Sequence, residues 1–88
     1  MGWNDVGFVL KSSKRRQLLF LLEKPKTPTQ LSKSMKSSLA NVSLKLKDLS
    51  DQGLIRCVNP KSLKGRIYEL TERGKKALEK IGEMEKQE

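Results

Sequence analysis

The clearest hydrophobic pattern in the chain lies in residues 37–55. Its apolar residues Leu39, Val42, Leu46 and Leu49 follow one another at steps of three, four and three. Residues at these steps lie along one side of an α-helix. The pattern therefore predicts a helix over residues 38–52 with one narrow buried face and a mostly polar opposite face.

The sequence also predicts where this helix ends. Glycine adopts the left-handed backbone conformation easily and often follows the last turn of a helix, which assigns Gly53 to that position. In a Schellman motif the next residue packs one turn back, so Leu54 is expected to contact Leu49. The apolar, β-branched segment that follows is expected to be a strand.

Two helices are predicted before this one. Residues 1–10 are apolar with little charge, and residues 14–24 contain the apolar run Leu18–Leu22 before Pro25 ends the helix. The candidate caps are Asn4 or Asp5 for the first helix and Ser12 or Ser13 for the second. A helix that is apolar all round is buried on several sides. The run is therefore expected to be covered by the N-terminal segment, by the last helix or by another subunit.

A further start signal follows Pro25. Thr27, Pro28 and Gln30 are spaced as the N-cap, the first helical residue and the third residue of a capping box. They predict a short helix to about Ser34 with Leu31 and Met35 on its inner side. The turn into the helix over residues 38–52 is short, so the two form a helix-turn-helix.

The C-terminal third predicts a hairpin and a last helix. Residues 54–58 and 66–70 have strand character, and the polar segment 59–65 between them is too short for another element. Thr71 is a suitable N-cap for the last helix, whose apolar stripe is Ala77, Leu78, Ile81 and Met84. The fold class expected is mainly α with a small β-hairpin wing (α+β), a winged helix-turn-helix. We expect one domain over residues 1–88, with its core in about 5–80 and a helical tail at 81–88.

The charge of the chain favours an anionic partner. Its formal net charge is +9, and residues 11–33 alone hold seven basic residues against one acidic residue. Such an excess is typical of nucleic-acid binding, less often of membrane binding, and also of a merely solubilising surface. The longest apolar run, Leu18–Leu22, is far too short to span a bilayer, and no signal peptide is recognisable. A soluble, cytoplasmic protein without a membrane partner is expected.

The residue types present exclude several kinds of chemistry. The chain has one cysteine and no histidine, which excludes an internal disulfide, a Cys/His zinc site and histidine-based acid–base catalysis. No nucleophile–base pair or phosphate-binding loop is recognisable. We therefore expect no enzyme activity, no cofactor and no metal. Cys57 falls in a strand pattern and is expected to fill a small space in the core.

Two runs of residues resemble a known superfamily. Val42-Ser43, Leu46, Leu49 and Gly53-Leu54-Ile55 are similar to the recognition helix of MarR-like and ArsR-like regulators, and Gly65 to Gly74 is similar to their wing and last helix. With residues 12–16 and Thr27-Pro28, the chain resembles small archaeal winged helix-turn-helix transcriptional regulators. The resemblance covers about residues 5–80.

This resemblance implies sequence-specific double-stranded DNA binding by a transcriptional regulator, with the helix over about 38–52 in the major groove. The positions implied to contact bases are Ser37, Ser38, Ala40, Asn41, Leu44, Lys45 and Lys47. Backbone phosphates would be held by Thr29, Gln30, Lys33 and Lys36. The wing, over about 59–66, would use Lys61, Ser62, Lys64 and Arg66. Arg66 has a structural alternative, as a strand residue that pairs with Glu69 or Glu72.

Some residues depart from the superfamily pattern. Leu44 stands where many relatives carry arginine, and the carboxylates of Asp48 and Asp51 would repel phosphate if they approached it. An exposed leucine also fits the alternative function, a protein-interaction winged-helix module in a transcription or assembly complex. A homodimer is expected through the N-terminal segment, the Leu18–Leu22 helix or the C-terminal helix. The alternative is that these apolar surfaces pack on each other within one chain.

Overall fold

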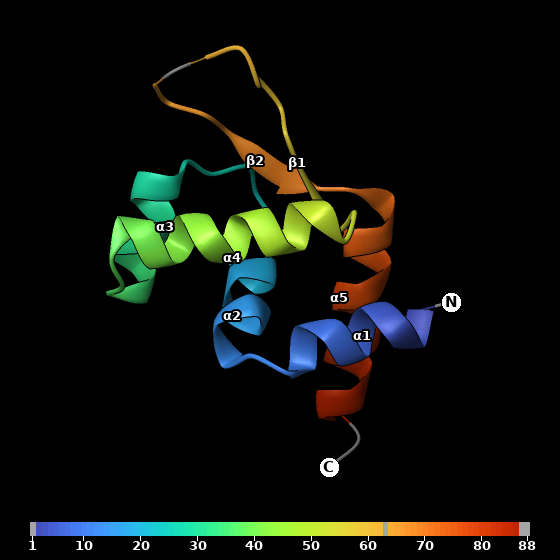
Figure 1. Cartoon of the computed structure of the whole chain (residues 1–88). Helices are drawn as coiled ribbons and strands as arrows, with labels where there is room; N and C mark the ends of the chain where they lie inside the picture. Colours follow the sequence, from blue (N-terminus) through green and yellow to red (C-terminus); the bar gives the residue numbers. More distant parts are fainter. Residues whose placement is uncertain (1, 63, 87–88) are drawn as a thin grey trace.

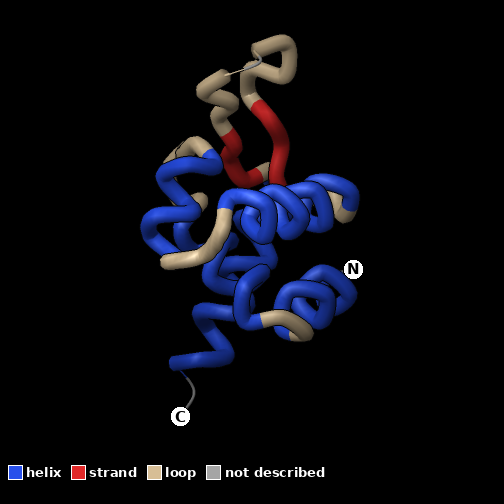
Figure 2. The backbone as a smooth tube through the Cα atoms, turned by 60° about the vertical axis from the view of Figure 1, so that its left-hand side comes forward, coloured by secondary structure: helices blue, strands red, loops and turns tan. Residues whose placement is uncertain are grey.

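A computed structural model describes residues 2–62 and 64–86. The element order is α1 (Gly2–Leu10), α2 (Ser13–Leu21), α3 (Pro28–Met35), α4 (Leu39–Asp51), β1 (Ile55–Cys57), β2 (Tyr68–Leu70) and α5 (Glu72–Lys86). The helices pack into one body, and the hairpin projects from it (Figures 1 and 2). This is the winged helix-turn-helix that the sequence predicts. Within the described residues, no helix has the length and apolar character needed to cross a membrane.

The helix over residues 38–52 is confirmed as α4, and so is its end. Gly53 has a φ of +85°, its N–H donates to the Ser50 carbonyl at 2.9 Å, and the Leu54 N–H donates to the Leu49 carbonyl at 3.0 Å. These are the two hydrogen bonds of a Schellman motif. Leu49 and Leu54 are both fully buried in the same core cluster, at the junction of α4 and β1.

The other helix starts are confirmed except the first. The Ser12 hydroxyl accepts the Arg15 N–H, and Thr27 and Gln30 form both hydrogen bonds of the capping box. α1 begins at Gly2, so Asn4 and Asp5 lie inside it and do not cap it. α2 ends at Leu21, three residues before the predicted end, because the chain turns at Leu22 and Glu23.

The core differs from the sequence pattern at three apolar positions. The buried cluster unites all five helices and the base of the hairpin. Leu39 and Met84 were expected on buried stripes but are 50% and 42% exposed. Leu39 is the first residue of α4 and Met84 lies in the last turn of α5, where the apolar spacing along a helix is a poor guide to burial. Cys57 is only half-buried: it lies on the same face as the buried Ile55, but two residues farther along β1, toward the projecting wing.

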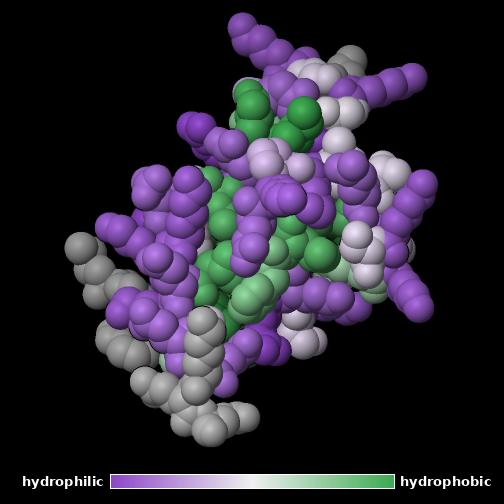
Figure 3. All heavy atoms as spheres, turned by 180° about the vertical axis from the view of Figure 1, so that it is seen from behind, coloured by the Kyte–Doolittle hydropathy of each residue, from purple (hydrophilic) through white to green (hydrophobic). Residues whose placement is uncertain are grey.

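The apolar run of α2 is largely covered within the chain. Leu18, Leu19 and Leu22 are buried, and Phe20 and Leu21 are half-buried against the same core. This agrees with the intrachain alternative for most of the run. The face turned away in Figure 1 still has apolar side chains at its centre, framed by hydrophilic ones (Figure 3).

The wing is held by more than its own two strands. β1 and β2 are antiparallel, with Ile55 opposite Leu70 and Cys57 opposite Tyr68. Tyr68 also exchanges two backbone hydrogen bonds with Lys26, of 2.9 and 3.1 Å, in the loop between α2 and α3. This bridge, which the sequence did not indicate, fixes the wing base beside the start of α3.

Candidate nucleic-acid interface

The N-terminal half of α4 is turned to solvent. Its N-cap is Ser38, whose hydroxyl accepts the Asn41 N–H at 3.2 Å. Because the buried side is formed by Val42, Leu46 and Leu49, the other side points outward. Of the predicted base-contact residues, Ser38, Ala40, Asn41, Leu44 and Lys47 are exposed, and Ser37 and Lys45 are half-buried.

Sequence reasoning missed two residues of this surface, Leu39 and Ser43, which are both exposed. Leu39 had been assigned to the buried stripe because its spacing from Val42 fits a helix face. Ser43 follows the buried Val42 by one residue, about 100° around the helix, and that angle alone would have placed it outside.

α3 presents the predicted phosphate-contact residues around its two ends. Thr29, Gln30, Lys33 and Lys36 are all exposed. The Gln30 side-chain oxygen accepts the Thr27 N–H at 3.0 Å, which leaves the two N–H donors of its amide available to a phosphate oxygen. Lys36 forms the turn in the left-handed conformation, with a φ of 53°, where a glycine is more usual.

The wing loop is organised by Asn59. Its side-chain oxygen accepts the Ile67 N–H at 2.7 Å, and its NH₂ donates to the Gly65 carbonyl at 3.2 Å. Ser62 is half-buried, and its hydroxyl donates to the Lys64 carbonyl. Ser62 therefore shapes the loop, whereas Lys61 and Lys64 are exposed.

Arg66 does not form the ion pair considered for it. It lies before β2, and its Nε donates to the Ser62 carbonyl at 2.9 Å. Glu69 instead pairs with Arg56 on the opposite strand, with its Oε2 at 2.5 Å from the arginine Nη2, and Glu72 pairs with Lys75.

Two grooves flank α4. The wing groove, of about 410 Å³, lies between the start of α3, α4 and the wing, and is lined by Thr27, Pro28, Thr29, Leu39, Ser43, Lys64, Gly65 and Arg66. It brings together one predicted phosphate contact, Thr29, and two predicted wing residues. Lys33, Lys36 and Lys61 line neither groove.

The outer groove, also of about 410 Å³, lies along the other side of α4. It is lined by Lys14, Met35, Ser37, Asn41, Val42, Leu44, Lys45 and Asp48. Four of the predicted base-contact residues, Ser37, Asn41, Leu44 and Lys45, therefore share this groove with Lys14 from the start of α2.

The basic start of α2 has mainly intrachain partners. The Arg15 guanidinium lies 3.9 Å from the Phe8 ring centroid, donates to the Phe8 carbonyl at 3.0 Å, and pairs with Asp48 at 3.5 Å. Arg16 pairs with Glu85. The contact with Arg15 also offsets the charge of Asp48, which reduces the repulsion expected between this carboxylate and a phosphate.

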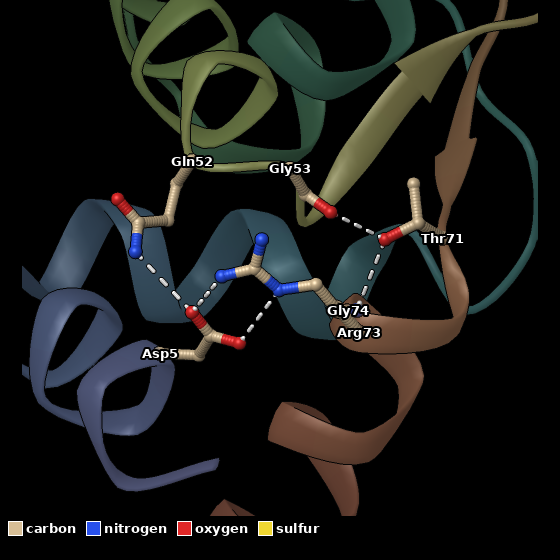
Figure 4. A network of polar contacts seen from close by, with 6 residues as sticks. All are labelled: Asp5, Gln52, Gly53, Thr71, Arg73 and Gly74. Carbon is tan, nitrogen blue, oxygen red and sulfur yellow. Dashed lines mark hydrogen bonds and ion pairs between the residues drawn. The ribbon is translucent and has the colours of Figure 1, made fainter. Parts of the chain in front are cut away.

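A polar network fixes the C-terminal end of α4 (Figure 4). Asp5 of α1 is 4% exposed, and it accepts hydrogen bonds from Gln52 at 3.2 Å and from Arg73 at 2.7 and 3.1 Å. The Thr71 hydroxyl donates to the Gly53 carbonyl at 2.6 Å and accepts the Gly74 N–H at 3.2 Å. The network joins α1, the end of α4 and the start of α5.

The arginine sets the charge state of this network. The hydrogen bond from Arg73 lowers the pKa of Asp5 below its ordinary value of 3.8, and it outweighs burial, which would raise the pKa. The same pair raises the pKa of Arg73. Asp5 is therefore a carboxylate at neutral pH and anchors α4 through a charged hydrogen bond.

The described part of the chain offers no metal site. None of its Asp, Glu and Cys side chains form a group of three or more that could hold a metal ion. The arrangement is instead that of a binding surface with polar, apolar and basic side chains on α3, α4 and the wing.

Comparison with known families gives a match over most of the chain. Residues 16–88 match the model of a family described as winged helix-turn-helix. A comparison with functionally curated proteins found no match.

Several solved structures share the fold. They include the adhesin competence repressor from Streptococcus pyogenes (TM-score 0.75, 23% identity, 85% of this chain and 57% of that one). A MarR family transcription regulator has a TM-score of 0.70 and 25% identity over 90% of this chain and 58% of that one. An ArsR family transcriptional regulator has a TM-score of 0.71 and 24% identity over 98% and 94%. The chain thus spans little more than half the length of the first two.

Proposed function

Because the chain belongs to the winged helix-turn-helix family, we propose that it binds double-stranded DNA sequence-specifically and regulates transcription. Structural neighbours described as a repressor and as MarR and ArsR family regulators support this proposal. In the proposed complex α4 enters the major groove, with its N-terminal half toward the base edges. The wing contacts the backbone or the minor groove.

The observation that carries the proposal is the wing groove. In this groove the start of α3, the exposed Leu39 and Ser43 of α4, and the basic residues Lys64 and Arg66 of the wing lie around one hollow. The hydroxyl of Thr29 and the two cations are suited to phosphate oxygens, whereas Asn41 on α4 is suited to an adenine edge. A duplex that contacts α4 would therefore also meet phosphate-binding groups on α3 and the wing.

Selection of bound sequences from a pool of random duplexes is the most direct experiment. We expect an enriched consensus whose affinity falls steeply with salt, because basic side chains release counterions from the phosphates. A protein that enriches no sequence and shows no salt-dependent binding in a gel-shift titration would contradict the proposal.

Two substitutions separate base reading from phosphate binding. Lys64→Ala should weaken all duplexes alike and reduce the salt slope by about 1, whereas Asn41→Ala should relax preference at one position with a loss of about 1–3 kcal/mol. Lys76 is an exposed residue of α5 that lines neither of the two grooves. Lys76→Ala removes the same charge and should change neither the affinity for DNA nor the sequence preference. Fluorescence anisotropy titrations at several salt concentrations measure all three.

A protein-interaction module is the second candidate function, and the 62% exposure of Leu44 favours it. In that case Leu44→Asp should abolish capture of a protein partner and leave the melting temperature unchanged. An unchanged set of captured proteins would count against this candidate.

We further propose that residues 1–88 act as one cytoplasmic domain that forms a homodimer. The exposed Met84 near the end of α5 and the half-buried Phe20 and Leu21 are the apolar residues that support an interface. A two-fold dimer would read two half-sites about one helical turn apart.

A further inference from the structure

The first two turns of α4 carry no charged residue. Residues 39–44 read LANVSL, and of these only Val42 is buried. The exposed side chains are therefore three apolar ones, Leu39, Ala40 and Leu44, and two small polar ones, Asn41 and Ser43. The first charge of α4 is that of Lys45.

The two leucines stand on opposite sides of this exposed surface. Leu39 is 50% exposed and lines the wing groove, and Leu44 is 62% exposed and lines the outer groove. Ala40 lies between them around the helix, at about 100° from Leu39. Together they form an apolar strip across the N-terminal half of α4.

Basic residues border the strip on both sides. Lys64 and Arg66 line the wing groove beside Leu39, and Lys14 and Lys45 line the outer groove beside Leu44. Asp48 lines the outer groove as well, but Arg15 offsets its charge. A surface that is apolar in the middle and basic at its edges is complementary to a DNA groove, where two phosphate backbones flank the base edges. This charge pattern favours DNA over an apolar protein partner as the occupant.

The side chains present match one kind of base pair. Guanine is read best by Arg or Lys and cytosine by Asp or Glu. None of these four residue types occurs in residues 39–44. Adenine is read by Asn, which is Asn41, and the 5-methyl group of thymine is read by apolar contact. Residues 39–44 thus offer partners for adenine and thymine only, apart from Ser43, which is not selective; Lys45 and Lys47, which could read guanine, follow them in the next turn of α4.

We infer that the N-terminal half of α4 selects A·T base pairs, with Leu39 and Leu44 in contact with thymine 5-methyl groups in the major groove. This inference rests on the proposed DNA binding and names its base specificity. Leu44, which departs from the superfamily pattern, is then a specificity residue.

The test replaces thymine by uracil, which removes only the methyl group. The probe is the tightest duplex from the random pool, prepared with thymine or with deoxyuridine throughout the bound site. Wild type should bind the uracil duplex at least about fourfold more weakly, the change that corresponds to one buried methyl group of about 0.8 kcal/mol. Leu44→Ala should bring the ratio of the two affinities closer to one, and the Leu39→Ala, Leu44→Ala double variant closer still.

Leu10→Ala is the matched control, because Leu10 is a leucine of similar exposure (43%) on α1. It should keep the wild-type ratio, and thermal melting should show all variants folded. Equal binding of the thymine and uracil duplexes by wild type would overturn the inference while leaving DNA binding intact. An unchanged ratio of the thymine-duplex and uracil-duplex affinities in Leu44→Ala would also overturn the inference. That result would be expected if Leu44 contacted a protein partner. Failure to bind any duplex would overturn the proposed function itself.

Discussion

At the scale of single residues, Asp5 shows how a buried charge is made acceptable in this fold. A carboxylate that loses its water must gain hydrogen bonds and an opposite charge. Asp5 obtains both from Arg73 and Gln52, at 2.7 to 3.2 Å. Its role is therefore to hold the end of α4 and the start of α5 against α1.

Asp5→Asn should destabilise the fold by about 1–3 kcal/mol at pH 7, because a charged hydrogen bond is lost at a buried site. Since the folded-state pKa of Asp5 is lowered below its ordinary value of 3.8, its contribution is fully present above that ordinary value. It is then lost as pH falls from there through the folded-state pKa. The stability difference between wild type and variant should be constant from pH 7 to pH 5 and shrink toward pH 3.

Urea unfolding at several pH values measures this difference. Asp51→Asn, which removes an exposed carboxylate from α4, should change stability by no more than about 0.5 kcal/mol at any of them. A difference between wild type and Asp5→Asn that persists undiminished at pH 3 would show that charge is not what Asp5 contributes.

At the scale of elements, the junction of α4, β1 and α5 depends on two glycines for different reasons. Gly53 has a φ of +85°, and an added Cβ would lie 3.0 Å from Arg73 Nη1. Gly74 has ordinary helical geometry, but its added Cβ would lie 2.0 Å from the Leu54 carbonyl oxygen. α5 can therefore approach the start of β1 only because residue 74 has no side chain.

Three alanine substitutions test this account. Gly53→Ala should cost about 1–2 kcal/mol because of its left-handed backbone, and Gly74→Ala about 2–4 kcal/mol because backbone must move. Gly82→Ala, in α5 with nothing within 4 Å of its added Cβ, should stabilise by about 0.5–1 kcal/mol. Chemical denaturation gives the order, and a Gly74→Ala variant as stable as Gly82→Ala would refute the close approach.

At the scale of the whole molecule, the basic excess has a definite distribution. Lys14, Lys64 and Arg66 come from α2 and the wing, far apart in sequence, and all border the two grooves beside α4. Other basic residues are neutralised within the chain, such as Arg15 by Asp48 and Arg16 by Glu85. The net charge of +9 is therefore an incomplete guide to the binding surface.

The proposed homodimer should be visible as a particle of twice the chain mass by light scattering, with two copies bound to a palindromic duplex. Met84→Asp, at an apolar position that is 42% exposed near the end of α5, should shift the free protein toward monomer. Val58→Asp, at a similarly exposed position after β1, should not. A monomer at all concentrations that binds one copy per duplex would contradict the dimer.

Much of the fold could be predicted because its signals are local. The capping box at Thr27, the Ser12 cap and the Gly53 stop each depend on a few neighbouring residues, and each is confirmed. Part of the candidate surface was equally accessible, since the outward positions of α4 follow from helical geometry. The prediction of burial failed at Leu39 and Met84, because it used the spacing of apolar residues and did not consider that both lie near the end of a helix.

The sequence by itself determined the order of the elements, the inner stripe of α4 from Val42 to Leu49, and its end at Gly53, because caps, periodicity and glycine act over a few residues. Only the tertiary structure decided that Asp5 meets Arg73, that Lys26 pairs with Tyr68, and that Leu39 stays exposed beside the wing groove. These facts depend on contacts between residues far apart in the chain, and a local sequence pattern does not specify which distant surface will cover it.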